Sequence, residues 1–370
     1  MLVYGVNLCN MNKRLFLRGF IFLSVCQALM SCVDGYKIIG NVPELADGTQ
    51  VYLRLVGPPS RDIDSVCVKD GYFEFGGLSV EKPIWALISV KGRFSALCDF
   101  YLEDGKINVK GISSHKAIAS GTPINDQYNI YNQTISVYND SLYRVSVEIS
   151  LAEEEVDREG LMMRRDRLQK EMEEREIDFI RTYPDSPIAL RIISYRASKI
   201  SSQQIRKMIS YLGSKMQQER EIVQIKDYAA RLAKTEEGAV APDFALNTID
   251  GEKFILSQKR GKYVLLDFWA SWCAPCRASF PTIAKIHEQY KGKALSVIGV
   301  SLDKDQKAWE KALNEEGCTW TQVCDLKGEI AKQYAIKAIP ALILIDPNGR
   351  IVGRFDKGEI VSKLSQIITE

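Results

Sequence analysis

The chain is poor in histidine, in excess charge and in long apolar runs. Only 2 histidines occur in 370 residues, and 49 basic residues nearly balance 47 acidic ones, for a formal net charge of +2. This balance argues against a nucleic-acid-binding protein, which usually carries a basic excess or stripe. After Val33 no apolar run of the sequence reaches the roughly 20 residues that cross a bilayer as a helix. We therefore expect no membrane-spanning helix beyond the N-terminus.

Composition and patterning predict a multidomain globular protein. Hydrophobic residues make up 46% of the chain and charged residues 26%, proportions that allow a sizeable core. The length of 370 residues predicts two or three compact units. We expect, in chain order, a targeting segment, an antiparallel β-sandwich, a helical middle segment and an α/β domain. The predicted boundaries are 1–32, 33–121, 122–236 and 237–370.

The N-terminal segment is typical of an exported protein. The basic pair Lys13-Arg14 precedes an apolar stretch, residues 19–30, that is too short to span a bilayer but fits a secretory signal. The stretch ends in Leu29-Met30-Ser31-Cys32, which resembles the bacterial lipobox, whose cysteine is acylated and becomes the first mature residue. We expect Met11 to be the start and Cys32 to carry lipid, which would anchor the protein to a membrane. An ordinary cleaved signal peptide is the alternative.

Short alternating strands dominate residues 33–121. Runs such as YKIIGNV, QVYLRLV and YFEF are separated by the turn pairs Asp47-Gly48, Asp70-Gly71 and Asp104-Gly105. The pattern predicts a small antiparallel sandwich. Within it, SVCVKDGYFEF, residues 65–75, predicts a hairpin that turns at Asp70-Gly71.

Helical spacing replaces this alternation in residues 122–236. Ser186-Pro187 predicts a helix start, with serine as the N-cap and proline in the first turn. A dense run of both charges, residues 164–181, is either a partner-binding surface or a solvated helix face, and the interspersed signs favour the second interpretation. The apolar residues at helical spacing are Leu161, Leu168, Met172 and Phe179, followed in a further helix by Ile205, Met208, Ile209, Leu212 and Met216.

Strands and helices alternate from Gly238 onward, which predicts an α/β domain. The buried strand YVLLDFWA, residues 263–270, runs directly into a segment that contains Cys273 and Cys276 and continues as a helix. A C-x-x-C beside a βαβ pattern is typical of a redox dithiol. At a strand-to-helix junction the unpaired N–H groups and the helix dipole favour an anion. Cys273 is therefore expected to be the nucleophilic thiolate.

The spacing of the two cysteines predicts a two-step exchange. Cys276 lies one helical turn after Cys273, so its sulfur can reach that of Cys273. Cys273 would attack a disulfide to form a mixed disulfide, and Cys276 would resolve it, while Pro275 stiffens the turn. Half of a zinc site is the alternative, but no second C-x-x-C exists, and His115 and His287 offer no paired ligand spacing. We expect no metal.

The segment VLLDFWASWCAPCRASFP, residues 264–281, resembles the active-site segment of thioredoxins, and more closely that of the TlpA/ResA-like exported thiol–disulfide oxidoreductases. The resemblance covers residues 238–370 and implies that the C-terminal α/β domain is thioredoxin-like. More weakly, residues 36–110 resemble the β domain that precedes such redox domains in many Bacteroidetes-like lipoproteins.

The resemblance also implies roles for residues around the dithiol. Asp267 matches the family's buried carboxylate, which relays protons to the resolving cysteine. Trp269 and Trp272 flank the site as the family's tryptophans do, and Pro281 corresponds to its helix-kinking proline. Ile339-Pro340 matches the loop whose cis-proline, an uncommon bond, lies against the dithiol. Together with Trp272 this loop is expected to bind an extended substrate.

The resemblance implies a periplasmic, membrane-anchored enzyme that reduces disulfides of client proteins, in cytochrome c maturation or in repair of misoxidised proteins. A membrane thiol carrier of the DsbD/CcdA kind would supply electrons. No cofactor is implied, because the dithiol is the redox group. Ala274, which with Pro275 supports the site, stands where ResA-like members often have an acidic residue, so their pH tuning is not carried over.

Two alternative functions, and the bonding state of four further cysteines, are not decided by the sequence. A peroxiredoxin-like peroxidase would need a threonine at Ala270, and a redox-sensing binding lipoprotein would capture a ligand with its front domains. In an oxidising compartment cysteines serve disulfides or redox chemistry. Cys318 and Cys324 are therefore a second disulfide, a redox relay or, as the favoured interpretation, two unrelated buried thiols. Cys67 and Cys98 are either inert sheet residues or a bridge.

Overall fold

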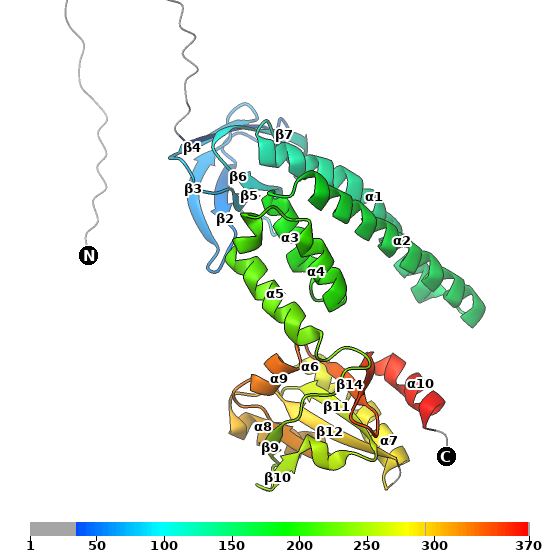
Figure 1. Cartoon of the computed structure of the whole chain (residues 1–370). Coiled ribbons are helices and arrows are strands. Elements are labelled where there is room, and N and C mark those ends of the chain that lie inside the picture. The colour runs from blue at the N-terminus through cyan, green and yellow to red at the C-terminus, as the bar shows by residue number, and fades with distance from the viewer. Residues whose placement is uncertain (1–34, 293, 369–370) are drawn as a thin grey trace, which may run out of the picture.

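The computed structural model describes residues 35–292 and 294–368. It places a β unit at one end, helices in the middle and an α/β unit at the other end (Figure 1). The predicted signal and its lipidation site, Cys32, lie outside the described residues and stay predictions. Within the described range, no helix combines the length and the apolarity that crossing a bilayer requires.

The β unit contains two four-stranded sheets in the described residues, with strand orders β4-β1-β7-β8 and β3-β2-β5-β6. Both sheets contribute to one core, in which Ile38 and Phe75 of the first sheet meet Leu53 and Ile88 of the second. The expected antiparallel pairing is wrong at one position, because β1 and β7 are parallel. The strands are β1 (Tyr36–Asn41), β2 (Gln50–Leu55), β3 (Arg61–Cys67), β4 (Tyr72–Gly77), β5 (Ile84–Val90), β6 (Ala96–Leu102), β7 (Gly105–Ser113) and β8 (Lys116–Ser120).

The predicted turn at Asp70-Gly71 is present and is closed by one antiparallel bridge between Lys69 and Tyr72, but the predicted hairpin does not extend along the two strands. β3 pairs with β2 and β4 pairs with β1, so the turn carries the chain from one sheet to the other. Asp70 and Gly71 both take positive φ, 51° and 76°, and a Cβ at Gly71 would lie 2.8 Å from Pro43 Cα. Alternating burial cannot separate the two arrangements, because Val66 and Val68 contact the same core as Phe73 and Phe75 whichever strands pair.

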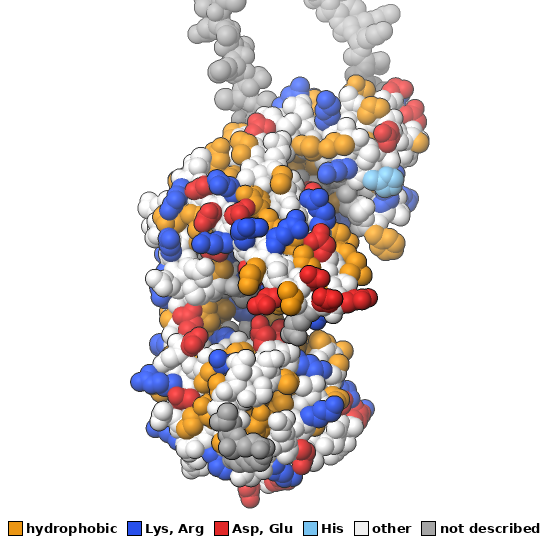
Figure 2. All heavy atoms as spheres, turned by 90° about the vertical axis from the view of Figure 1, so that its right-hand side faces the viewer, with side chains coloured by type: hydrophobic (Ala, Val, Ile, Leu, Met, Phe, Trp, Pro, Cys, Tyr) orange, Lys and Arg blue, Asp and Glu red, His pale blue; other side chains and the backbone are white. Residues whose placement is uncertain are grey.

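The middle segment begins with a helical hairpin of α1 (Pro123–Leu151) and α2 (Glu155–Thr182), which projects from the molecule in Figure 1. Charged side chains of both signs are interspersed over the face seen in Figure 2. Of the predicted run, residues 164–181, most side chains are exposed, as expected of a solvated helix face, whereas Met172, Glu176, Phe179 and Ile180 are buried.

The shorter helices of the middle segment pack into a core of their own. They are α3 (Pro187–Arg196), α4 (Ser202–Ser210), the 3-10 helix η1 (Met216–Gln218) and α5 (Arg220–Leu232). Ser186 caps α3 as predicted, since its hydroxyl accepts from Ile188 N. The helix expected to continue to Met216 instead ends at Ser210. Tyr101 of β6 and Ala335 of the α/β unit join this core, so the middle segment contacts both neighbours.

The described α/β unit is built on a five-stranded sheet of order β13-β12-β11-β14-β15. The central strand β11 is parallel to β12 and antiparallel to β14, and both faces of the sheet are covered by apolar clusters. The elements are β9 (Ala245–Asn247), β10 (Lys253–Ile255), η2 (Leu256–Lys259), β11 (Tyr263–Trp269), α6 (Ala274–Arg277), α7 (Phe280–Tyr290), β12 (Leu295–Ser301), α8 (Gln306–Glu316), β13 (Thr321–Cys324), α9 (Glu329–Gln333), β14 (Ala341–Ile345), β15 (Ile351–Phe355) and α10 (Lys357–Ile367).

Candidate active site

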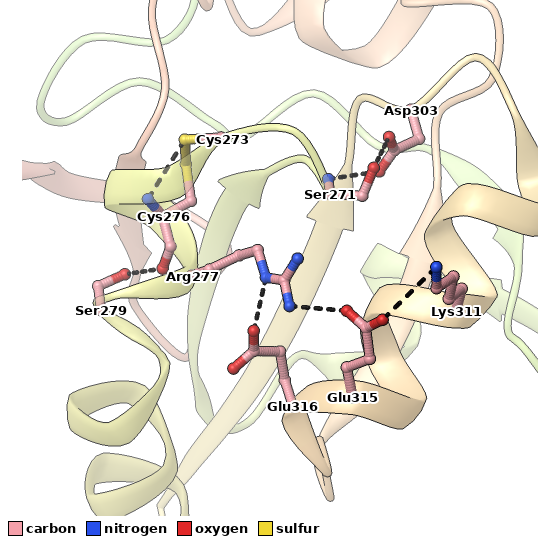
Figure 3. Close-up of polar contacts among 9 residues, drawn as sticks. All are labelled: Ser271, Cys273, Cys276, Arg277, Ser279, Asp303, Lys311, Glu315 and Glu316. Atoms are coloured by element: carbon pink, nitrogen blue, oxygen red, sulfur yellow. Dashed lines mark hydrogen bonds and ion pairs between the residues drawn. A yellow bond between two sulfur atoms is a disulfide. The ribbon is translucent and has the colours of Figure 1, made fainter.

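The two cysteines of the C-x-x-C lie where the central strand ends. β11 ends at Trp269, and after a short turn Cys273 is the N-cap of α6, its Sγ accepting from Cys276 N at 3.2 Å. Cys273 and Cys276 form a disulfide, and their exposed fractions are 4% and 0%. Figure 3 shows the pair at the start of the helix. The structure therefore contains the oxidised form of the predicted dithiol.

Two prolines shape the backbone around the disulfide. Pro275 lies in the first turn of α6 and Pro281 in the first turn of α7, positions where a missing N–H costs no helical hydrogen bond. Between the two helices, Ser279 Oγ donates to the carbonyl of Cys276 at 2.6 Å. The predicted kink is thus a break between two helices. Ala274 begins α6 and, lacking an ionisable side chain, brings no charge to it.

Asp267 is a buried carboxylate in the middle of β11. Asp267 lies two residues from both Leu265 and Trp269 in the strand, so the three side chains point to the same face of the sheet. Leu265 and Trp269 belong to the apolar cluster that contains Cys276, and Asp267 therefore faces this cluster. Asp267 is 1% exposed, and neither carboxylate oxygen has a hydrogen-bond partner in the described part of the chain. Burial raises the pKa of this carboxyl to about 7, which allows it to exchange a proton near neutral pH.

The two tryptophans of the motif have opposite environments. Trp269 is fully buried, stacks edge-on against Phe280 at 4.8 Å between ring centroids, and donates from Nε1 to Gln322 Oε1 at 3.1 Å. Trp272 is 69% exposed beside Cys273. Trp269 therefore belongs to the core, whereas Trp272 is free to contact another molecule.

The predicted cis-proline loop lies at the same end of the sheet as the disulfide. The peptide bond between Ile339 and Pro340 is cis. The register pairs Ala341 of β14 with Phe268 of β11, so Pro340 sits at the end of β11 from which the chain enters the C-x-x-C. The structure thus brings together positions that are more than sixty residues apart in the sequence.

Asp303 holds the turn that precedes the nucleophile, and the sequence analysis missed it. Its carboxylate accepts from Ser271 N at 2.8 Å, from Ser271 Oγ at 2.6 Å and from Ser301 Oγ at 2.7 Å, and it is 2% exposed. The contact with Ser271 is visible in Figure 3. An acidic residue two positions after the buried strand β12 was the available signal.

Arg277, next to Cys276, ties α6 to the end of α8. It donates from Nε to Glu316 at 2.5 Å and from Nη2 to Glu315 at 2.8 Å, and Figure 3 shows Lys311 on the far side of Glu315. The Arg277 side chain is 33% exposed, so water screens these pairs. Their effect is to position the second cysteine's helix.

Comparison with known proteins identifies the redox unit. Residues 238–354 match the AhpC/TSA family, and residues 36–128 match a domain of unknown function, DUF4369. The chain is 36% identical over 144 residues to the thioredoxin-like protein YneN of Bacillus subtilis, covering 37% of this chain and 84% of that protein. It is 31% identical over 132 residues to the thiol-disulfide oxidoreductase ResA of Bacillus cereus, covering 36% and 76%. The chain belongs to the ResA-like thiol–disulfide oxidoreductases.

A solved structure is similar to the same portion of the chain. The thiol-disulfide oxidoreductase of Bacteroides fragilis is 39% identical, with 35% of this chain and 99% of that chain covered and a TM-score of 0.34. The family match and the two Bacillus relatives confirm the expected thioredoxin-like C-terminal domain and the enzyme class. The C-x-x-C disulfide is the group through which such an oxidoreductase exchanges electrons.

The other four cysteines within the described residues are separate thiols. Among the described residues, Cys67, Cys98, Cys318 and Cys324 are free, so neither alternative bridge is present. Burial raises the pKa of Cys318 to about 12 and that of Cys324 to about 11, with nearby carboxylates adding to the effect. No three His, Cys, Asp or Glu side chains within residues 35–292 and 294–368 are grouped so that they could bind a metal ion.

Proposed function

We propose that this oxidoreductase is lipid-anchored at Cys32, faces the periplasm and reduces disulfides of client proteins, in cytochrome c maturation or in disulfide repair. The observation that supports a catalytic role is the redox pair Cys273–Cys276, with a fully buried carboxylate, Asp267, on the sheet face that packs against Cys276 and a pKa for this carboxyl raised to about 7. The reducing direction follows from the family resemblance rather than from the geometry.

The exchange begins from the reduced dithiol. The Cys273 thiolate attacks one sulfur of the client disulfide, which forms a mixed disulfide and releases the first client thiolate. Asp267 accepts the proton of Cys276, whose thiolate attacks the Cys273 sulfur and expels the second client thiolate. The client gains two electrons and, from solvent and the enzyme, two protons. The enzyme is left with the disulfide seen in the structure.

Client binding is assigned to the exposed groups around the disulfide. Trp272 offers an exposed aromatic surface, and the backbone at Ile339-Pro340 lies at the end of the sheet next to the dithiol. An extended client segment can pair with this loop as an added strand. A membrane thiol carrier of the DsbD/CcdA kind would then return two electrons to the disulfide.

Trapping of mixed disulfides tests this function. A Cys276→Ser chain cannot complete the second step, so it should accumulate disulfide-linked adducts with envelope proteins on non-reducing gels. Cys273→Ser is the matched control and should trap none. A redox-sensing binding protein would trap few or no clients in either variant, and that outcome would contradict the proposal.

The reduction potential tests the direction separately. A reductant should have a Cys273–Cys276 potential near the roughly −270 mV of thioredoxin, whereas an oxidant would lie near the roughly −120 mV of DsbA. The peroxidase alternative has less support, because the residue three positions before Cys273 is the buried Ala270, which has no hydroxyl group. A peroxide-consumption assay should show no turnover.

A further inference from the structure

A cleft of about 440 Å³ lies between the helical segment and the redox domain. Residues 335–338 form part of its redox-domain wall and lead directly into Ile339-Pro340. Ser198–Ser201, from the loop between α3 and α4, and Tyr228 of α5 form the helical wall. The cleft is therefore built by both units and borders the loop to which client binding is assigned.

Three cations line this cleft, and in the described chain none of them is neutralised by a carboxylate within 4 Å. Lys199 Nζ lies 3.7 Å from the centroid of the Tyr195 ring, and Lys337 Nζ lies 3.8 Å from that of Tyr228. Arg354 Nη2 donates to neutral oxygens of Thr235 and Tyr334.

Glu236 is the one carboxylate among the described residues that line the cleft, and it offsets part of this charge. It accepts from Ser202 N at 2.6 Å and from Ser202 Oγ at 2.7 Å, two neutral donors that leave its charge in place, and that charge acts on Arg354. Three cations against one carboxylate still leave the cleft with a net positive charge. Arg354 Nε is buried and has no hydrogen-bond partner within residues 35–292 and 294–368. Desolvation lowers the pKa of both Lys337 and Arg354. Lys337 and Arg354 are thus partly removed from water without an ion-pair partner within 4 Å in the described chain, so an entering carboxylate would be favoured.

We infer that this cleft binds acidic side chains of a client polypeptide close to the disulfide that the enzyme exchanges. Lys337 precedes Ile339 by two residues, and an extended chain rises about 3.3 Å per residue. A client paired with the cis-proline loop therefore reaches the cleft within a few residues of its cysteine. This inference rests on the proposed function, and it gives the helical segment a role in client selection.

Matched peptides test this selection. Each carries one internal disulfide, and the residues flanking the cysteines are aspartate in one peptide and asparagine in the other. The second-order rate constant for reduction by the reduced full chain is measured for both. We expect the aspartate peptide to react roughly tenfold faster at low salt, and the advantage to shrink in high salt as charges are screened.

A charge reversal at Lys199, in the helical wall of the cleft, tests whether the cleft causes the faster reduction of the aspartate peptide. Lys199 is exposed, lies in the helical segment and is not part of the proposed catalytic site. Lys199→Glu should reduce the aspartate-to-asparagine rate ratio to about one while leaving the asparagine peptide's rate unchanged. Lys207→Glu reverses an exposed charge of α4 that does not line the cleft, and it should leave the ratio at its wild-type value.

The outcomes separate failure of the inference from failure of the proposed function. Equal rates for both peptides with the wild-type chain, or the same preference in Lys199→Glu, would overturn the acidic-client cleft. Stabilisation by inorganic phosphate without any peptide preference would show that the cleft takes a free anion, and would also overturn it. Failure to reduce either peptide would contradict the proposed function instead.

Discussion

Replacement of the buried Asp267 by asparagine should stabilise the redox domain, and more so at high pH. In the folded chain burial raises the pKa of this carboxyl from 3.8 to about 7. Between these two values the folded state holds a proton that the unfolded state has lost, so the free energy of unfolding falls as pH rises. The loss is complete above pH 7. A difference of about three pH units, at about 1.4 kcal/mol each, gives a penalty of about 4 kcal/mol at pH 8.

Asparagine has nearly the same shape and does not ionise, so it escapes this penalty at every pH. At pH 4.5 the wild-type penalty is only about 1 kcal/mol, so the advantage of Asp267→Asn should grow by about 3 kcal/mol between pH 4.5 and pH 8. Burial of the asparagine amide has a cost that does not depend on pH. It therefore cancels when the stability advantage at pH 4.5 is subtracted from that at pH 8. This makes the change in advantage, rather than its absolute size, the quantity to measure.

Denaturant unfolding of the oxidised chain, followed by tryptophan fluorescence, measures this advantage. The chain has 5 tryptophans, and all except Trp85 lie in the redox domain, so the signal reports that unit. Asp250→Asn, in the exposed turn at Asp250-Gly251, is the matched control and should show no pH-dependent advantage. A constant advantage for Asp267→Asn from pH 4.5 to 8 would refute the assignment of a raised pKa.

Three further substitutions test contacts around the site and in the helical core. Asp303→Ala leaves Ser271 N and two hydroxyls without their acceptor. It should cost about 3 kcal/mol of stability in denaturant unfolding, against about 1 kcal/mol for Ser271→Ala. Equal costs for the two variants would contradict the role of Asp303 in holding the turn before Cys273. Arg277→Gln removes partly exposed ion pairs and should cost less than about 1 kcal/mol, decreasing in 1 M salt. Arg196→Met leaves the buried Glu176 without its ion-pair partner and should cost about 3–5 kcal/mol by circular dichroism, most of it recovered in Glu176→Met/Arg196→Met.

The sequence predicted the local parts of the site because each depends on a short segment. The apolar run that forms β11, the two cysteines that follow it and Pro275 lie within fourteen consecutive residues, and their strand-to-helix geometry follows from local preferences. Asp267 stood out because a carboxylate in an apolar strand is costly to bury. The cis bond before Pro340 came from the resemblance, since no local pattern marks it.

The contacts that the sequence analysis missed depend on the order of strands in the sheet. Asp303 reaches Ser271 from 32 residues away and Gln322 reaches Trp269 from 53 residues away. Both contacts exist because β12 lies beside β11 and β13 beside β12. Hydrophobic alternation does not specify which strands are neighbours. The same limitation explains the error at β3 and β4, where the pattern identified two strands and their contacts with one core, but not the sheet to which each strand belongs.

The free thiols could in principle attack the Cys273–Cys276 disulfide, and the pKa values of three of them explain why they do not. The thiolate is the attacking species in exchange, and the fraction of thiolate at neutral pH falls tenfold for each unit by which the pKa exceeds the pH. Burial raises the pKa of Cys98 and Cys318 to about 12 and that of Cys324 to about 11. At pH 7 each is therefore deprotonated in roughly one molecule in ten thousand or fewer. Cys318 and Cys324 pack against the cluster that holds the disulfide, yet their environment keeps them protonated, so exchange within the folded redox domain is confined to Cys273 and Cys276.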